Sequence, residues 1–222
     1  MHTKTNLSLF RFFYKTQIDI TKFIMSKSKN AHDYRKMMGI ETIQDLIFYQ
    51  YAKIIARSTF QVANGKSAKQ DHFGFIREAF QDLKTGKKSW SKITREDRQF
   101  VEAEKKCVYC GSTKDLHWEH IIPRSLLIKP ECRTCNLVQG ISNQIWACRK
   151  CNLLKGTKGL YQFFKLKYPN ERKFYDFIPP LLEKKYLKTI YNCHKCTQTL
   201  EKEDLDCDGR LTVLDIDSII YQ

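Results

Sequence analysis

The chain has 222 residues, of which 42% are hydrophobic, and its 39 Lys and Arg residues against 24 Asp and Glu give a formal net charge of +15. This length and composition predict a soluble, globular protein of one or two small domains, and no apolar run approaches a transmembrane span. The strongly basic balance favours a polyanionic partner such as nucleic acid, although ribosomal and membrane-surface proteins share it.

The N-terminal segment 1–30 does not have the features of a secretory signal. Arg11 and Lys15 interrupt its apolar stretch, and no small-residue cleavage site follows. The segment is also not rich enough in Arg and Ser to argue for a transit peptide. We expect a disordered extension, with Met25 as an alternative start, on a protein of the reducing cytoplasm.

From residue 31 to 105 the apolar residues recur with helical periodicity. Thr42 and Asp45 are spaced as a capping pair at the start of one helix, and residues 71–84 predict a second. A third, charged helix is expected to begin at Ser91 or Thr94 and to run into Cys107. Seven basic residues in this region are candidates for tracking a DNA backbone, with a solvated face as the alternative for each: Lys53, Arg57, Lys66, Lys69, Lys84, Lys87 and Lys88.

Eight of the nine cysteines fall in Cys-x-x-Cys pairs. This pattern is typical of metal ligands in a reducing compartment rather than of a secreted disulfide scaffold. The pairs Cys107/Cys110 and Cys148/Cys151 bracket a hairpin-sized segment. Each pair places two thiolates on one tight turn, and two such turns make a closed tetrahedral zinc site. The separation of the pairs exceeds that of a simple zinc ribbon, so further functional residues are expected between them.

The segment between these pairs carries polar residues at informative spacings. The run EHIIP at Glu119–Pro123 is followed by Asn143, five residues before the second cysteine pair, and Asn152 follows the last cysteine directly. At these residues the chain resembles the HNH endonucleases, or ββα-metal nucleases, over about a quarter of its length. It departs from the family pattern in two places, because Glu119 replaces the more usual Asp and the third letter is Asn152 rather than His.

The resemblance implies an α+β protein with a small ββα-metal core at residues 106–158 and helices on either side. It also implies hydrolysis of DNA with a divalent cation, Mg²⁺ or Mn²⁺. His120 is the expected general base, since neutral imidazole takes up a proton near pH 7. Glu119 and Asn152 offer the oxygen ligands that such a cation prefers, and Asn143 is expected to orient the loop that carries His120. Zinc on the four cysteines would be structural, because four thiolates leave no open position.

Other residues and other classes of function remain open. Lys155 and Arg124 are candidate DNA contacts, with a solvated lysine as the simpler interpretation of Lys155. His117, beside Trp118, is expected to pack or to support the site rather than to act as a base. A zinc-stabilised nucleic-acid-binding module without catalysis is the main alternative, but it has no need of the four polar motif residues together. A zinc-dependent protein-interaction domain explains the cysteines but not the charge.

After the motif, two more helices are expected at residues 160–168 and 181–192, separated by prolines. Two cysteine pairs remain, Cys132/Cys135 within the insert and Cys193/Cys196 at the end of the last helix. Each pair supplies half of a tetrahedral site, so together they would form a second zinc site that ties the C-terminal tail to the nuclease loop. Unmetallated, reduced thiols are the alternative.

The tail from Cys193 onward holds seven acidic residues against three basic ones, so it carries about −4 and the rest of the chain about +19. We expect it to fold against the basic body or to bind a metal of its own. Residues 204–215, DLDCDGRLTVLD, follow the EF-hand calcium pattern in a dockerin-like form. The alternative is a degenerate HNH copy with Gly209 in place of its histidine. The expected calcium ligands are Asp204, Asp206, Asp208 and Asp215, together with the carbonyl of Arg210.

Overall fold

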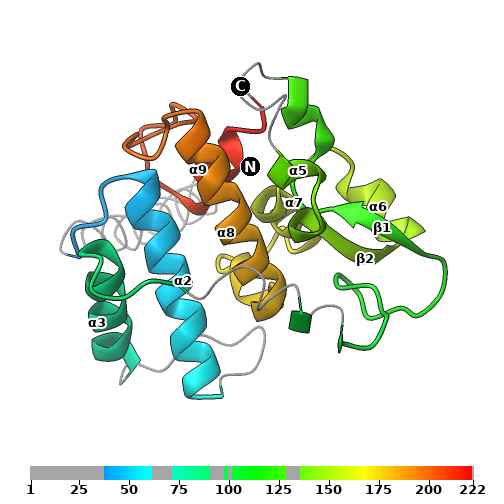
Figure 1. Ribbon diagram of the computed structural model, residues 1–222, viewed down its shortest axis with the longest axis horizontal. Coiled ribbons are helices and arrows are strands. Elements are labelled where there is room, and N and C mark those ends of the chain that lie inside the picture. Colours follow the sequence, from blue (N-terminus) through cyan, green and yellow to red (C-terminus); the bar gives the residue numbers. More distant parts are fainter. Residues whose placement is uncertain (1–37, 62–71, 91–97, 100–101, 129–135, 222) are drawn as a thin grey trace, which may run out of the picture. The chain divides into compact units, whose positions relative to one another are not determined.

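The computed structural model describes residues 38–61, 72–90, 98–99, 102–128 and 136–221. Residues 41–222 belong to one compact unit, which combines helices with a two-stranded sheet and so confirms the predicted α+β class (Figure 1). The expected N-terminal extension lies outside the described residues. No described helix is long and apolar enough to cross a membrane.

The elements are α2 (Ile43–Thr59), α3 (Phe73–Lys84), β1 (Leu116–His120), 3-10 helix η2 (Arg124–Ile128), α5 (Asn136–Gln139), 3-10 helix η4 (Ile141–Asn143), β2 (Gln144–Cys148), α6 (Arg149–Lys155), α7 (Leu160–Lys167), 3-10 helix η5 (Phe174–Phe177), α8 (Pro180–Cys196) and α9 (Val213–Ser218).

Helix α2 begins where the sequence predicts. The Thr42 hydroxyl accepts a hydrogen bond from the Asp45 backbone N–H at 3.2 Å, which satisfies one of the unpaired donors of the first turn. The Asp45 carboxylate in turn accepts from the Glu41 N–H at 3.1 Å and from the Lys84 ammonium at 2.9 Å. This last bond joins α2 to α3, and α2 also packs against α8. The apolar face of α2 is the core of the helical region.

Two helix boundaries differ from the sequence prediction. No helix runs into Cys107, because Glu102 is the last described helical residue and residues 104–107 have no regular structure. The backbone N–H of Cys107 is instead bonded within a tight turn. Helix α8 extends past its expected end at Asn192, because its last turn is held by His194, whose Nε2 lies 3.0 Å from the carbonyl oxygen of Ile216.

Strands β1 and β2 pair antiparallel, with Glu119 opposite Ile145 and His120 opposite Gln144. Helix α6 follows β2 without a loop and packs against both strands, as Figure 1 shows. This is the ββα arrangement that the resemblance implies. Tyr109, which lies between Cys107 and Cys110, packs this ββα unit against α7, since its ring centroid lies 4.8 Å from that of Phe163.

The acidic tail folds against the rest of the unit, with α9 packed on α2 and α7. The carboxylate of Asp217 is fully buried and accepts hydrogen bonds from the Gln162 N–H, at 2.7 Å, and from the Tyr186 hydroxyl. A Cβ atom on Gly159 would lie only 2.3 Å from that carboxyl group, so the approach requires glycine. Burial raises the pKa of Asp217 to about 7, although its hydrogen bonds act in the opposite direction.

Candidate active site and metal centre

The four motif cysteines Cys107, Cys110, Cys148 and Cys151 converge, with their sulfur atoms all within 4.8 Å of one another. The Sγ atoms of Cys110 and Cys148 are 3.7 Å apart, and the cysteines are free thiols. A tetrahedral zinc ion with Zn–S bonds of about 2.3 Å has S···S edges of about 3.8 Å. The cluster therefore fits the predicted zinc.

Two local turns create this convergence. The N–H of Cys107 donates to the carbonyl of Ser112 at 2.7 Å, and the N–H of Gly111 donates to the carbonyl of Cys107 at 2.8 Å. Gly111 has a φ of 78°, a left-handed conformation that suits glycine. In the second turn, Cys148 is the N-cap of α6 and Cys151 lies in the first turn of that helix. Pairing of β1 with β2 then brings the two turns together.

The thiols differ in how readily they ionise. Burial raises the pKa of Cys107 and of Cys151. Burial also raises the pKa of Cys110, but hydrogen bonds from the Ser112 backbone and from the other three thiols lower it to about 7. Because zinc binds thiolates, Cys110 is the first expected to lose its proton as the metal enters.

Glu119 and Lys155 form a buried ion pair beside the sheet. Lys155 Nζ lies 2.8 Å from Glu119 Oε1 and donates to the carbonyl of His120 at 2.9 Å, and the Lys155 side chain is 0% exposed. Burial raises the pKa of Glu119 and lowers that of Lys155, while their mutual attraction opposes both shifts. The predictions of Lys155 as a solvated residue or as a DNA contact are therefore wrong. The signal in the sequence was its spacing of four residues from Cys151, which places both on the buried side of α6.

Only one oxygen of Glu119 is satisfied by this ion pair. The other, Oε2, is buried and has no hydrogen-bond partner among the described residues, which is uncommon and costly for a carboxylate oxygen. Asn152 is half-buried on α6, one turn before Lys155. Glu119 Oε2 and the Asn152 side chain offer oxygen atoms of the kind that a divalent cation prefers.

His120 is the last residue of β1, and its side chain is half-buried. Burial lowers the pKa of its imidazole, and the positive charges of Arg124 and Lys155 lower it further. The ring is therefore neutral at pH 7 and able to accept a proton. Arg124 is exposed at the start of η2, so its guanidinium remains accessible to a phosphate.

Asn143 is fully buried below the loop that follows His120. Its Oδ1 accepts from the N–H of Ile122, and its Nδ2 donates to the carbonyls of Ile122 and Val138, with all three distances at 2.8 Å. Its backbone carbonyl also accepts from Ile121 N–H at 2.9 Å. Every polar group of the amide therefore acts on the backbone around the loop, which is the geometry that a loop-orienting residue needs.

Several other predicted residues lie elsewhere. His117 does not pack, because its side chain is exposed on β1. Arg57 cannot track DNA, since it is buried and its guanidinium donates to the carbonyl of Asp176 at 2.7 Å. The pair Cys132/Cys135 lies outside the described residues, so the second zinc site stays a prediction. The other cysteine pair of that predicted site is described: Cys193 is buried and Cys196 is exposed.

In the C-terminal loop, Asp204, Asp206 and Asp215 have carboxylate oxygens within 4.8 Å of one another. Asp208 is not part of this described cluster, so three of the four predicted side-chain ligands come together. Gly209 has a φ of 78°, and its N–H donates to Asp204 Oδ2 at 2.7 Å. The second oxygen, Asp204 Oδ1, is buried and has no hydrogen-bond partner in the part of the chain that the structure describes.

Asp215 also has a structural role that the sequence prediction missed. Its Oδ1 accepts from the N–H of Leu205 at 2.8 Å, and its Oδ2 accepts from the N–H of Thr212 at 2.6 Å. With Thr212 it completes a capping box for α9. The residue thus holds the two ends of the loop together.

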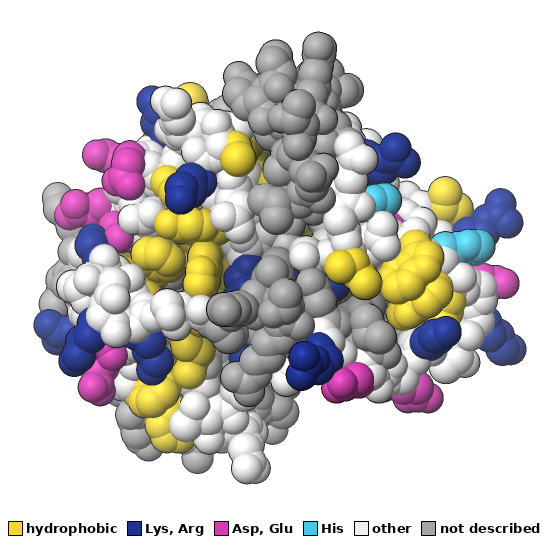
Figure 2. Space-filling model, viewed as in Figure 1, with side chains coloured by type: hydrophobic (Ala, Val, Ile, Leu, Met, Phe, Trp, Pro, Cys, Tyr) yellow, Lys and Arg dark blue, Asp and Glu magenta, His cyan; other side chains and the backbone are white. Residues whose placement is uncertain are grey.

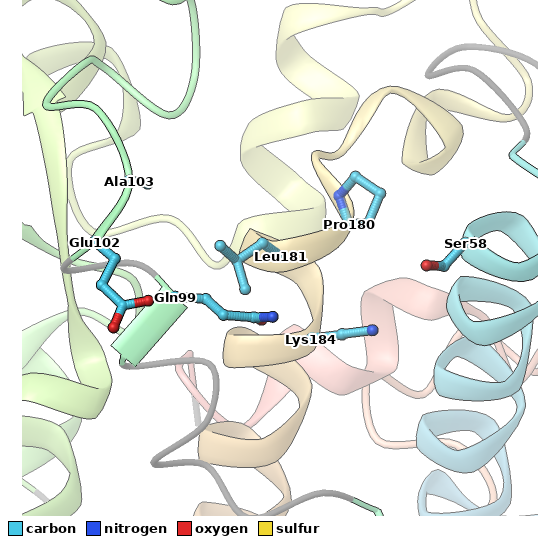
Figure 3. Close-up of a pocket in the computed structure, with 7 residues that line it drawn as sticks. All are labelled: Ser58, Gln99, Glu102, Ala103, Pro180, Leu181 and Lys184. Atoms are coloured by element: carbon cyan, nitrogen blue, oxygen red, sulfur yellow. The ribbon is translucent and has the colours of Figure 1, made fainter.

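An open pocket of about 470 Å³ lies in the helical region and contains none of the predicted site residues. Figure 3 shows Glu102 and Lys184 among the residues that line it, with Gln99 between them in the view. It is lined by Ser58, Gln99, Glu102, Ala103, Pro180, Leu181 and Lys184.

Residues 107–158 match a family model described as HNH endonuclease. No curated protein and no solved structure matches the chain. The matched span covers both motif cysteine pairs, the ββα elements and the polar residues of the site. Residues 107–158, about a quarter of the chain, are therefore similar to the HNH endonuclease domain.

Proposed function

We propose that this domain hydrolyses phosphodiester bonds in DNA with the help of one divalent cation, and that His120 is its general base. One observation carries the proposal. The buried and unpartnered oxygen of Glu119 belongs to the residue directly before an imidazole that its surroundings keep neutral. A cation ligand and a proton acceptor are the two groups that metal-assisted hydrolysis requires.

In this mechanism His120 takes a proton from the attacking water. Asn143 holds the loop after His120, and Lys155 fixes the His120 carbonyl and orients Glu119. Glu119 Oε2 and Asn152 would hold the cation, Mg²⁺ or Mn²⁺, which would supply Lewis-acid stabilisation of the charge on the scissile phosphate and the leaving 3′ oxygen. Arg124 is placed to contact a neighbouring phosphate. The zinc cluster is structural and keeps the two ends of the hairpin together.

The test is cleavage of supercoiled plasmid with Mg²⁺ or Mn²⁺ by the parent protein, His120→Ala and the matched control His117→Ala. His117 lies on the same strand but is exposed, so its loss should leave cleavage unchanged. Loss of the general base should slow cleavage by about 10²–10⁴-fold, with DNA affinity and zinc content retained. Near-normal cleavage by His120→Ala would refute the assignment.

The alternative is a zinc-stabilised module that binds nucleic acid without cutting it. The Glu119–Lys155 ion pair favours it, because a lysine already neutralises the carboxylate that a catalytic cation would need. Binding and cleavage assays on the unmutated parent protein are enough to distinguish the two functions. Tight DNA binding with no nicked or linear product in either metal would establish the binding module.

We also propose that the loop formed by Asp204, Asp206 and Asp215 binds Ca²⁺ as a structural clip. The clustered carboxylates and the unpartnered Asp204 Oδ1 support this. Calorimetric titration with Ca²⁺ should detect binding that Asp204→Ala abolishes and that the exposed neighbour variant Glu203→Ala retains. Absence of binding at millimolar Ca²⁺ would favour the degenerate HNH copy.

The second zinc site, formed by Cys132, Cys135, Cys193 and Cys196, remains a proposal of the same kind. It rests on the pairing of the cysteines in the sequence. Elemental analysis should find that Cys193→Ser/Cys196→Ser lowers the zinc content relative to the parent protein. An unchanged zinc content would leave these four residues as reduced thiols.

A further inference from the structure

Two tryptophans stack on one face of the β-hairpin. Trp118 of β1 and Trp146 of β2 are opposite each other, with ring centroids 3.9 Å apart and an interplanar angle of 25°. The Trp146 carbonyl accepts from Val108 N–H at 3.0 Å and so points away from β1. The tryptophans therefore form a non-hydrogen-bonded pair, the kind in which opposing side chains lie closest.

This stack lies two residues from His120, which ends β1. Glu119, between them in the chain, points to Lys155 of α6. Two residues along a strand span about 7 Å. A group placed on Trp118 would thus be within a single extended nucleotide of the proposed general base.

The stack is only partly covered. Trp118 is 47% exposed, although it is the largest kind of apolar side chain. Trp146 covers one side of its ring, and about half of the side chain remains exposed. A stacked tryptophan pair beside the proposed general base is a candidate interaction surface.

Several basic side chains lie near the stack. The Lys105 ammonium lies 5.5 Å from the centroid of the Trp146 ring, and Arg149 and Lys150 are exposed directly after β2. Figure 2 shows an apolar patch over the β1–β2 region with histidine, basic and acidic side chains around it. Aromatic rings combined with positive charge are the features by which proteins hold unpaired bases and their phosphates.

We propose that Trp118, supported by Trp146, is a stacking platform for an unpaired base, so that the substrate is DNA with single-stranded or distorted positions next to the cleaved bond. This inference rests on the proposed nuclease function and names its substrate class. A base in an intact duplex is stacked on both sides and does not offer its face to Trp118. An unpaired base stacks there, and the cations contact its phosphates.

The test compares three fluorescein-labelled DNAs without added divalent cation: a short duplex, the same duplex with a single-stranded gap, and that gap built from abasic nucleotides. The gapped and abasic probes have matched phosphates and differ in the bases alone. The parent protein should bind the gapped probe about 10- to 100-fold more tightly than the abasic one. Trp118→Leu should lose this preference, Trp118→Phe should retain most of it, and both should retain zinc.

A second readout needs no change at the platform. In Trp90→Phe the remaining fluorescence comes from Trp118 and Trp146, because the chain has three tryptophans, and Trp90 packs separately against Phe48 and Tyr191. Gapped DNA should quench that fluorescence and abasic DNA should not.

The outcomes separate this inference from the proposed function. Equal affinity for the three probes, or an equal loss for all three in Trp118→Leu, would overturn the platform while leaving a nuclease that acts on duplex DNA. Self-association that Trp118→Leu abolishes, without discrimination among the probes, would assign the patch to a second copy of the chain. Preference for gapped DNA without cleavage would retain the platform and refute catalysis.

Discussion

Replacing Lys155 by Met should destabilise the domain more than any other single change of a lysine on α6. The substitution keeps much of the side-chain volume but removes the ammonium group from a site that is 0% exposed. Glu119 then remains buried without its ion-pair partner, and the His120 carbonyl loses a donor at 2.9 Å. Removing one partner of a buried ion pair costs about 3–5 kcal/mol. For a unit of this size, that corresponds to a fall in the melting temperature of about 6–20 °C.

Thermal and urea unfolding, followed by circular dichroism in the presence of zinc, measure this effect. Lys150→Met is the matched control, because Lys150 is exposed on the same helix and its loss should change stability by less than about 0.5 kcal/mol. The double variant Glu119→Gln/Lys155→Met should recover part of the loss, because it leaves no unpaired charge. A Lys155→Met protein as stable as Lys150→Met would refute the buried ion pair.

Three further predictions concern the same domain. Asn143→Asp places a carboxylate oxygen against the carbonyls of Ile122 and Val138 and should cost about 2–4 kcal/mol in urea unfolding; a change below about 1 kcal/mol would contradict the loop-clamping role. Cys110→Ser should lower zinc content and destabilise the core, because structural zinc supplies on the order of 10–16 kcal/mol of apparent binding energy. The control is Cys207→Ser, at an exposed cysteine outside the cluster, which should leave zinc content unchanged. The cleavage rate should fall with decreasing pH only below the ordinary histidine pKa of about 6.5, because burial and nearby positive charges lower the pKa of His120. A cleavage rate that already falls above a pH of about 6.5 would exclude His120 as the base.

The elements predicted best were those whose signals are local. The Thr42–Asp45 cap is formed by neighbouring residues and appears in the structure where the sequence places it. The cysteine turns are equally local, since a Cys-x-x-Cys spacing brings two thiols onto one turn whatever surrounds it. The prediction of a helix that runs into Cys107 was wrong. A local signal explains this too, because the Cys107 N–H is bonded within the tight turn and is not available for a helical hydrogen bond.

The environment of each site residue could not be predicted in this way. Asn143 and Ile122 are 21 residues apart in the chain, and only the pairing of β1 with β2 brings them into contact. The tryptophan stack depends on the same register. A shift of one residue would move these side chains to the opposite face of the sheet, and single-sequence patterns do not determine the register.

By itself, the sequence determined which residue types this domain has for binding zinc, accepting a proton and holding a cation, because the motif encodes them at fixed short spacings. Only the tertiary structure decided that Lys155 is a buried partner of Glu119 rather than a solvated residue, and that the acidic tail places Asp217 beneath α7. The physical reason is that burial and pairing of charge depend on groups distant in the chain. The Lys155–His120 contact spans 35 residues and the Asp217–Gln162 contact spans 55, so packing determines the ionisation state and the role of each group.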